Sequence, residues 1–237
     1  MINKTKRLMV PRSVDIPKKT FFWGSTPTPG SHSAERSVTL LTLLRDYLHY
    51  GDKEREITRI LNSGFVKVDG KIAKERRRGV GFMDLVELAP LKKSYRIIYD
   101  KKGRLQAVPE KESLVNVKLL KVLDKISNAP GKFQLCFHDG QNIVTEDTDI
   151  TPGDVLVVQI PEKKVLNILK LQSGNKVFLT GGSHVGSVAT VKKVEVKESS
   201  GSNLIHFEEG FSTIAEYAFP ISSPKYQYEM PEVNLDA

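Results

Sequence analysis

The sequence predicts an α+β protein of several domains, in which a short helical segment is followed by many short strands. Helical spacing of apolar residues is clearest in residues 40–61. From residue 65 onward apolar residues mostly alternate, and turns rich in Gly, Pro and Asp separate the alternating segments. We therefore expect an extended arm at 1–36, a helix–helix–hairpin domain at 37–93, a β-rich central domain at 94–172, a small β-barrel at 173–221 and a tail at 222–237.

The first 36 residues are expected to be extended because prolines interrupt any helix. Basic residues are interleaved there with Phe21, Phe22 and Trp23, a mixture that can neutralise phosphates and stack on unpaired bases. The basic residues are Lys4, Lys6, Arg7, Arg12, Lys18 and Lys19. Such an arm would become ordered only against a partner. The alternative is a disordered tail whose aromatic side chains dock on the neighbouring domain.

Residues 38–88 carry the clearest local pattern. Leucines at helical spacing follow Ser37, a candidate N-cap, and Gly51 can end this first helix. A second, shorter helix is expected between Asp52, a candidate N-cap, and Gly64, a candidate left-handed residue just beyond the helix end. The sequence therefore predicts two consecutive short helices.

After Gly64 the pattern changes to alternation, and Asp69-Gly70 is a strong signal for a hairpin turn. The return segment is crowded with basic side chains, and Leu85–Leu88 is expected to be the closing strand. These basic residues are Lys71, Lys74, Arg76, Arg77 and Arg78. Consecutive arginines repel one another unless an anion is near, and arginine makes bidentate contacts with phosphate. We interpret this loop as a candidate anion site; the alternative is an exposed, solvated charged loop.

Residues 94–221 are expected to form short strands joined by turns. Tyr95–Tyr99 and the following Arg104-Leu105 predict a hairpin, whereas residues 114–126 fit either a pair of strands or a helix. Further strands are expected at 133–137, 155–158, 165–171, 176–180, 188–196 and from 204. Strands at this spacing are typical of small barrels or sandwiches.

The net charge of +8 is unevenly distributed. Residues 1–110 contain 23 Lys and Arg against 12 Asp and Glu, whereas residues 111–237 contain 13 against 16. The first part therefore carries +11 and the second −3, which favours a polyanion bound at one end of the molecule. Neither a transmembrane helix nor a signal peptide is expected, because the apolar runs are short. A single cysteine, Cys136, excludes an internal disulfide and suits a reducing cytosol.

Three patterns that could indicate chemistry are weak. The loop Gly181–Gly186 has the glycine spacing of a phosphate-binding loop, but Ser187-Val188 replaces the required Lys and Ser or Thr. Cys136 and His138 are close in sequence, yet nothing nearby activates a thiolate. One Cys and five scattered His residues provide no zinc-ligand spacing. The sequence thus contains no pattern that requires catalysis, a metal or a cofactor.

Residues 40–88 resemble the small RNA-binding fold named after bacterial ribosomal protein S-four, through the two helices, Gly64 and the hairpin Phe65–Lys71. Three further groups of residues are similar to the small-subunit ribosomal protein S-four-e family of archaea and eukaryotes. These are Gly81-Phe82-Met83-Asp84 with Tyr99-Asp100-x-x-Gly103-Arg104; Pro27-x-Pro29-Gly30-x-His32; and His138-Asp139-Gly140, Gly153-Asp154 and Gly174-Asn175 through Gly186. The last group resembles the family's central domain and its KOW segment, an SH3-like barrel.

The resemblance implies a structural, non-enzymatic constituent of the small ribosomal subunit in the cytoplasm. The implied partners are small-subunit rRNA and neighbouring ribosomal proteins, with no membrane, cofactor, metal or small-molecule substrate. Together with the basic pattern, it implies RNA contacts by Lys4, Lys6, Arg7, Arg12, Lys18, Lys19, Trp23, His32, Arg45, Lys53, Arg55, Arg59, Lys67, Lys71, Lys74, Arg76, Arg77, Arg78, Lys92 and Lys93, and by Gly181, Gly182, Ser183, His184 and Gly186.

The chain departs from the family pattern at three positions. Ser187 and Ala189 stand where the family usually has Arg and Gly, and Gln141 stands where Arg is frequent. We therefore expect the KOW segment to contact RNA weakly, and the arm and the first domain to carry most of the binding. Two alternatives remain: an RNA-modifying enzyme with the same RNA-binding fold, and a translation or transcription factor whose KOW barrel binds a protein.

Overall fold

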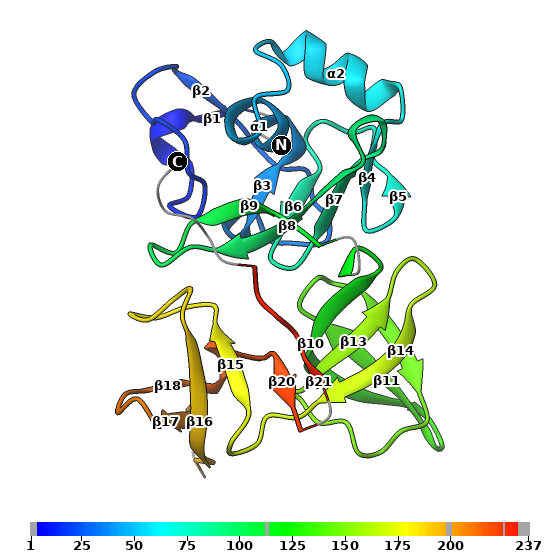
Figure 1. Cartoon of the computed structure of the whole chain (residues 1–237), viewed down its shortest axis with the longest axis vertical. Helices are drawn as coiled ribbons and strands as arrows, with labels where there is room; N and C mark the ends of the chain where they lie inside the picture. The colour runs from blue at the N-terminus through cyan, green and yellow to red at the C-terminus, as the bar shows by residue number, and fades with distance from the viewer. Residues whose placement is uncertain (1–3, 112–113, 198–200, 225, 232–237) are drawn as a thin grey trace. The chain divides into compact units, whose positions relative to one another are not determined.

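The chain forms two compact units in the computed structural model, which describes residues 4–111, 114–197, 201–224 and 226–231 (Figure 1). Unit 1 comprises residues 1–100, 104–116 and 231–237, and unit 2 comprises residues 101–103 and 117–230. Most described elements are strands and only a few are helices, which confirms the α+β class.

Unit 1 is built on an antiparallel five-stranded sheet in the order β5-β4-β7-β8-β9. The two helices α1 and α2 lie on the same side of this sheet (Figure 1). Its strands are β4 (Val66–Val68), β5 (Lys71–Ile72), β7 (Leu85–Leu88), β8 (Lys93–Tyr99) and β9 (Leu105–Pro109); β3 (Ser37–Thr39) pairs separately with β6 (Gly79–Gly81). The helical elements are α1 (Leu40–Thr42), the π-helix η3 (Leu43–Tyr47), α2 (Glu54–Asn62) and the 3₁₀ turns η1 (Arg7–Met9), η2 (Ala34–Arg36) and η4 (Ala89–Leu91).

The hairpin and the end of the second helix confirm the sequence-based expectations, whereas the N-cap of α2 is Lys53 and not Asp52. Asp69 and Gly70 have φ angles of 52° and 74°, as a two-residue hairpin turn requires, and Gly64 ends α2 at φ 75°. The first helix differs in its cap. Ser37 belongs to β3, and the hydroxyl of Thr39 accepts the hydrogen bond from the Thr42 N–H at 3.3 Å. The helix cap is thus two residues further along the chain than Ser37.

The N-terminal segment is not the extended arm that its prolines suggest. β1 (Lys4–Lys6) pairs with β2 (Trp23–Ser25), and Val10 and Val14 are buried in unit 1. The Leu105 N–H also donates to the Ser13 carbonyl at 2.7 Å, which ties the arm to β9. The expectation of an arm that orders only against a partner is therefore wrong for residues 4–36, because strand pairing and the burial of Val10 and Val14 hold the segment within unit 1.

Unit 2 contains two antiparallel five-stranded sheets, in the orders β12-β11-β10-β13-β14 and β18-β17-β16-β15-β19. The first consists of β10 (Val117–Ala129), β11 (Lys132–Phe137), β12 (Asn142–Thr145), β13 (Val155–Gln159) and β14 (Lys164–Leu169). The second consists of β15 (Lys176–Leu179), β16 (Val188–Glu195), β17 (Leu204–Phe207), β18 (Ser212–Ile214) and β19 (Ala218–Pro220), with the 3₁₀ turn η6 (Ala215–Tyr217) before β19.

The ambiguous segment 114–126 forms most of one long strand, β10. Its residues Val117–Lys121 pair with β13, and the residues from Val122 onward pair with β11. An irregularity between Val122 and Asp124 allows the strand to bend between these two partners. The first sheet therefore curls around a core formed by Leu120, Val122, Leu135, Phe137, Ile150, Leu156 and Val158.

Residues 222–228 also differ from the loose tail expected at 222–237, of which residues 225 and 232–237 lie outside the described part of the structure. β20 (Ser222–Ser223) pairs with β21 (Tyr226–Gln227), and Tyr228 is buried. The Tyr228 N–H donates to the Ile221 carbonyl at 2.8 Å. A buried aromatic ring next to a polar, proline-containing sequence gave no periodic signal, so the sequence could not reveal this packing.

Lys121 connects the two sheets of unit 2. Its ammonium group is buried and donates to the carbonyl oxygens of Ala215, Glu216 and Ala218 at 3.1, 2.7 and 2.7 Å. Burial lowers the pKa of Lys121 to about 8, since desolvation disfavours the charged amine. Lys121 therefore has a lower pKa in the folded protein than in the unfolded chain.

We predict that this pKa makes part of the stability depend on pH. Between about pH 8 and pH 10.5 the unfolded chain binds more protons at Lys121, so the free energy of unfolding gains a contribution that increases with pH. Relative to Lys121→Met, the wild type should gain up to about 3 kcal/mol across this range. Chemical denaturation of both proteins at several pH values measures the gain, and a pH-independent difference between the two would contradict it.

Candidate nucleic-acid interface

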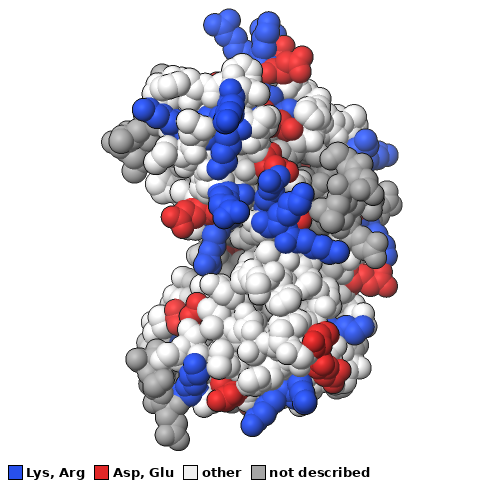
Figure 2. All heavy atoms as spheres, turned by 90° about the vertical axis from the view of Figure 1, so that its left-hand side faces the viewer, with Lys and Arg blue, Asp and Glu red and all other residues white. Residues whose placement is uncertain are grey.

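The basic side chains expected to contact RNA lie almost entirely in unit 1. Figure 2 shows Lys and Arg side chains gathered on one face of unit 1, which is drawn in the upper part of the picture. The glycine loop 181–186 belongs to unit 2. The exposed members of the set are Lys6, Arg12, Lys19, Lys53, Arg55, Arg59, Lys71, Lys74, Arg76, Lys92 and Lys93; the half-buried members are Lys18, Arg45, Lys67, Arg77 and Arg78.

Helix α2 presents the exposed Lys53, Arg55 and Arg59 because its apolar face, with Ile57 and Leu61, is buried. The carboxylate of Glu56 accepts hydrogen bonds from the backbone N–H groups of Asp52 and Lys53 at 3.0 and 3.2 Å. The Lys53 and Asp52 N–H groups lower the pKa of Glu56, so this carboxylate stays ionised and caps the helix. The basic side chains are therefore mounted on a helix with a defined start.

Two of the three consecutive arginines have partners within unit 1. Arg76 forms an ion pair with Glu54 of α2 at 2.6 Å. The Nε of Arg77 donates to the Thr26 carbonyl at 3.0 Å, while the Arg77 carbonyl accepts from the Thr28 N–H at 2.9 Å. The loop is thus attached to both α2 and the arm, and these contacts offset part of the repulsion that the sequence implied.

Burial does not fit two of the predicted RNA contacts. Arg7 is only 2% exposed, and its Nε donates to the Pro17 carbonyl at 2.7 Å. The buried imidazole Nε2 of His32 lies 2.9 Å from the Asp84 carboxylate. Both side chains stabilise the arm, so the expectation that they contact RNA is corrected. Lys4 lies in β1, but its side chain is outside the described part of the structure.

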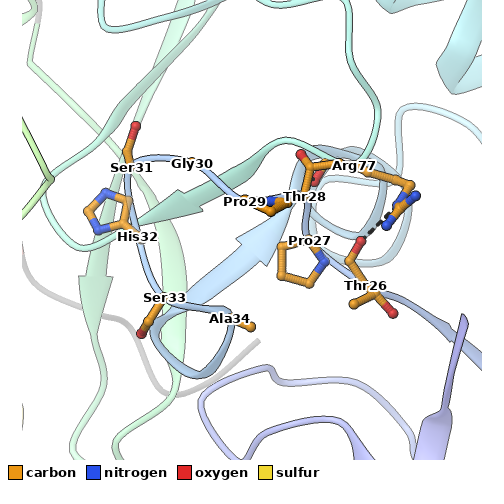
Figure 3. Close-up of a pocket in the computed structure, with 10 residues that line it drawn as sticks. All are labelled: Thr26, Pro27, Thr28, Pro29, Gly30, Ser31, His32, Ser33, Ala34 and Arg77. Carbon is orange, nitrogen blue, oxygen red and sulfur yellow. Dashed lines mark hydrogen bonds between the residues drawn. The ribbon is translucent and has the colours of Figure 1, made fainter. Parts of the chain in front are cut away.

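The arm and the arginine loop together enclose a hollow of about 390 Å³ that the sequence did not reveal. Figure 3 shows residues 26–34 curving around it, with His32 and Arg77 on opposite sides. The His32 ring packs closely against the backbone of Gly81, because a Cβ at Gly81 would lie 2.5 Å from Cγ of this ring. This contact holds the curved segment in place. Gly81 and His32 are 49 positions apart in the sequence, so only the fold brings them together.

The remaining predicted contacts are separate from this surface or paired locally. Arg45 bonds its neighbour Asp46 through Nε and Nη2 at 3.2 and 2.8 Å. In unit 2, His184 stacks on Phe211 with ring centroids 4.1 Å apart. The backbone around Gly181–Gly186 forms a turn before strand β16, so no helix N-terminus follows the glycines. Ala189 is buried in the core of this sheet, which accounts for a methyl group there.

Within the described ranges, no three or more His, Cys, Asp or Glu side chains lie close enough together to hold a metal ion. No helix among these residues has the length and apolar character needed to cross a membrane.

We predict that Gly81→Ala destabilises unit 1 by about 1–3 kcal/mol, because the new methyl group would overlap the His32 ring. In a His32→Ala background the same substitution should cost much less, since the overlapping ring is gone. Denaturant unfolding of the two single variants, the double variant and the wild type measures this coupling. Equal costs in both backgrounds would show that His32 does not press on Gly81.

Comparison with known proteins matches the chain to ribosomal proteins. A sequence profile of the Ribosomal family S4e matches residues 91–165. The small ribosomal subunit protein eS4 of Thermoplasma volcanium is 55% identical over 231 residues, covering 98% of this chain and 97% of that protein. The eS4 protein of Picrophilus torridus is 50% identical over 232 residues, covering 98% of each.

A solved structure supports the same relationship. The crystal structure of the 30S ribosomal protein S4e from Thermoplasma acidophilum matches with a TM-score of 0.74 at 47% identity, covering 81% of this chain and 98% of that chain. The S-four-e resemblance in the sequence is therefore confirmed, and this protein belongs to the S4e family of small ribosomal subunit proteins.

Proposed function

We propose that this protein is a structural constituent of the small ribosomal subunit that binds rRNA mainly through unit 1. The observation that carries the proposal is the set of exposed Lys and Arg side chains on the arm, α2 and the β4–β5 hairpin, in a chain whose relatives are small-subunit proteins. Such side chains neutralise phosphates, and this gives strong, salt-dependent affinity. In this role the protein supports subunit assembly and translation.

We divide the proposed RNA-contacting residues into two groups, according to whether the side chain is exposed or half-buried. The exposed basic residues of unit 1 contact phosphates directly, and the half-buried Arg77 acts at the edge of the hollow. The half-buried Lys18 and Arg78 contribute through the part of each side chain that is accessible. Lys4 remains part of the proposal through its position in β1. The loop of Gly181, Gly182, Ser183, His184 and Gly186 contributes a minor contact, since Ser187 supplies no charge after Gly186.

The proposed domains follow the sequence boundaries. Residues 37–93 form an S-four-type RNA-binding domain behind the arm at 1–36, residues 94–172 form the central domain, and 173–221 form a KOW domain with an SH3-like barrel before the C-terminal segment 222–237. The order of α2, β4 and β5 supports the first assignment, and the five antiparallel strands from β15 to β19 support the barrel.

The proposed partners are small-subunit rRNA and neighbouring ribosomal proteins, and the proposed location is the cytoplasmic ribosome. Family membership supports both proposals, as well as a non-enzymatic role without a cofactor or small-molecule substrate. A free translation or transcription factor that binds a protein through its barrel is not favoured, because the relatives carry ribosomal names.

Sedimentation of native lysate tests the function directly. We expect the protein to co-migrate with the small subunit at low salt and to dissociate only as the salt concentration of the wash rises. A ribosomal constituent remains attached in stoichiometric amounts. A protein found only at the top of the gradient at low salt would contradict the proposal.

We predict that removing charge from the arginine loop lowers the salt dependence of rRNA binding. Arg76→Gln with Arg78→Gln should weaken binding and reduce the slope of log K against log salt by about 1–2, because each lost phosphate contact accounts for about 0.9. Arg77 is left in place because it bonds Thr26. Filter binding at several salt concentrations measures the slope.

The matched control removes two exposed charges from unit 2, by Lys192→Gln with Lys193→Gln. This variant should leave the slope unchanged. Equal effects of the two double variants would contradict the assignment of rRNA binding mainly to unit 1.

A further inference from the structure

Three consecutive aromatic side chains of the arm remain exposed although the arm itself is packed. Phe21, Phe22 and Trp23, together called the aromatic platform, are 70%, 62% and 52% exposed. The sequence left open whether these rings dock on the neighbouring domain. These exposed fractions leave much of each ring accessible to a ligand, and exposing adjacent large apolar side chains is unfavourable unless a partner covers them.

The backbone below the platform is held in place. Trp23 lies opposite Lys6 in the β1–β2 pair, and the Arg7 N–H donates to the Phe22 carbonyl at 2.9 Å. Arg7 is itself buried and bonded to the Pro17 carbonyl. The rings are therefore presented by an ordered scaffold, which lowers the entropy cost of binding a ligand.

Positive charge surrounds the rings. The Lys6 Nζ lies 5.6 Å from the centre of the Phe22 ring, and the Arg7 guanidinium lies 5.4 Å from the Phe21 ring. Phe22 and Trp23 meet edge to face, with centroids 4.7 Å apart and planes at 85°. Among residues 5–23 there are five Lys and Arg residues against one acidic residue, Asp15, and Asp15 is bonded to Arg104. The partner must combine negative charge with flat apolar faces.

We propose that the aromatic platform binds unpaired bases of RNA by stacking, so that the arm is specific for single-stranded segments. The inference rests on the proposed rRNA-binding function and names the kind of RNA that this part of the site takes. Single-stranded RNA supplies both phosphates for Lys6, Lys18 and Lys19 and open base faces for the rings. In a duplex the bases stack on one another, so their faces are not available. An apolar protein surface would leave the basic rim without counter-charges.

The sequence supplies a reporter at the site, because Trp23 is the only tryptophan. The experiment titrates the full chain with an oligoadenylate of about twelve nucleotides, a length within the usual range of single-strand sites. Two probes with comparable phosphates serve as controls: the same ribose-phosphate chain without bases, and the oligoadenylate paired with its complement. We expect the oligoadenylate to quench Trp23 fluorescence and the two control probes to leave it nearly unchanged.

Two substitutions test the role of the rings while keeping the reporter. Phe22→Ala, and separately Phe21→Ala, should weaken binding of the oligoadenylate by about 5- to 150-fold, the range for loss of one stacked base. The affinity for the ribose-phosphate probe without bases should be unaffected. Phe65→Ala is the matched control, because Phe65 is another exposed phenylalanine of unit 1, with 46% of its surface exposed, and it lies outside the aromatic platform. It should change neither affinity nor quenching.

The outcomes separate this inference from the proposed function. Equal quenching of Trp23 fluorescence by the oligoadenylate and by the ribose-phosphate probe without bases would overturn the stacking proposal, even if rRNA still binds. Binding of the oligoadenylate that leaves Trp23 fluorescence unchanged would overturn it as well. A Trp23 blue shift with anionic phospholipid vesicles and no response to oligoadenylate would assign the rings to a membrane surface and overturn it too. Failure to bind any RNA at low salt would contradict the rRNA-binding function itself.

Discussion

The arrangement of unit 1 depends on the contact of His32 with Asp84 beneath Gly81. The Asp84 carboxylate accepts from the Gly81 N–H at 2.9 Å and also meets the imidazole of His32. The Ile97 N–H donates to the Asp84 carbonyl at 3.0 Å, so the contact joins the arm to the central sheet. Because the arm is fixed there, residues 26–34 can close around the hollow. A segment that would otherwise be a loose basic tail becomes a shaped surface.

The charge of the chain and its architecture agree with one another. Most of the exposed basic residues proposed to contact RNA lie on the arm, α2 and the hairpin, and each of these segments also has apolar side chains buried in unit 1. In unit 2, Ser187 and Gln141 stand at positions where Arg is usual or frequent in the family. Gln141 bonds Asp139 through its side chain at 2.8 Å, and Asp139 also pairs with the buried Lys118 at 3.0 Å. The Asp139 carboxylate is thus bonded within unit 2, and the neutral Gln141 beside it adds no charge for RNA, which fits a smaller share of RNA contact there.

Local signals predicted the elements that depend on local chemistry. Gly64 and the Asp69-Gly70 turn need left-handed backbone, and the structure has it at all three positions. Apolar patterns and turn residues predicted β11, β13, β14, β15, β16 and β17 of unit 2, but they left β10 ambiguous and did not reveal β12, β18 or β19. The arm, the C-terminal hairpin and the cap at Thr39 could not be predicted in this way, because contacts between distant residues determine them. The exposure of Lys53 and Arg55 could be predicted from helical periodicity, whereas the Arg76–Glu54 and Arg77–Thr26 contacts join residues 22 and 51 positions apart. Spacing cannot reveal such pairs.

The central claim is that RNA contact is concentrated in unit 1. Ultraviolet crosslinking of native small subunits, followed by mass spectrometry of the peptides of this protein that retain RNA, tests it most directly. The account predicts that crosslinked peptides come mainly from residues 5–23 and 53–78, with few from residues 176–207. Crosslinks concentrated in residues 176–207, with the arm and the hairpin unmodified, would contradict it.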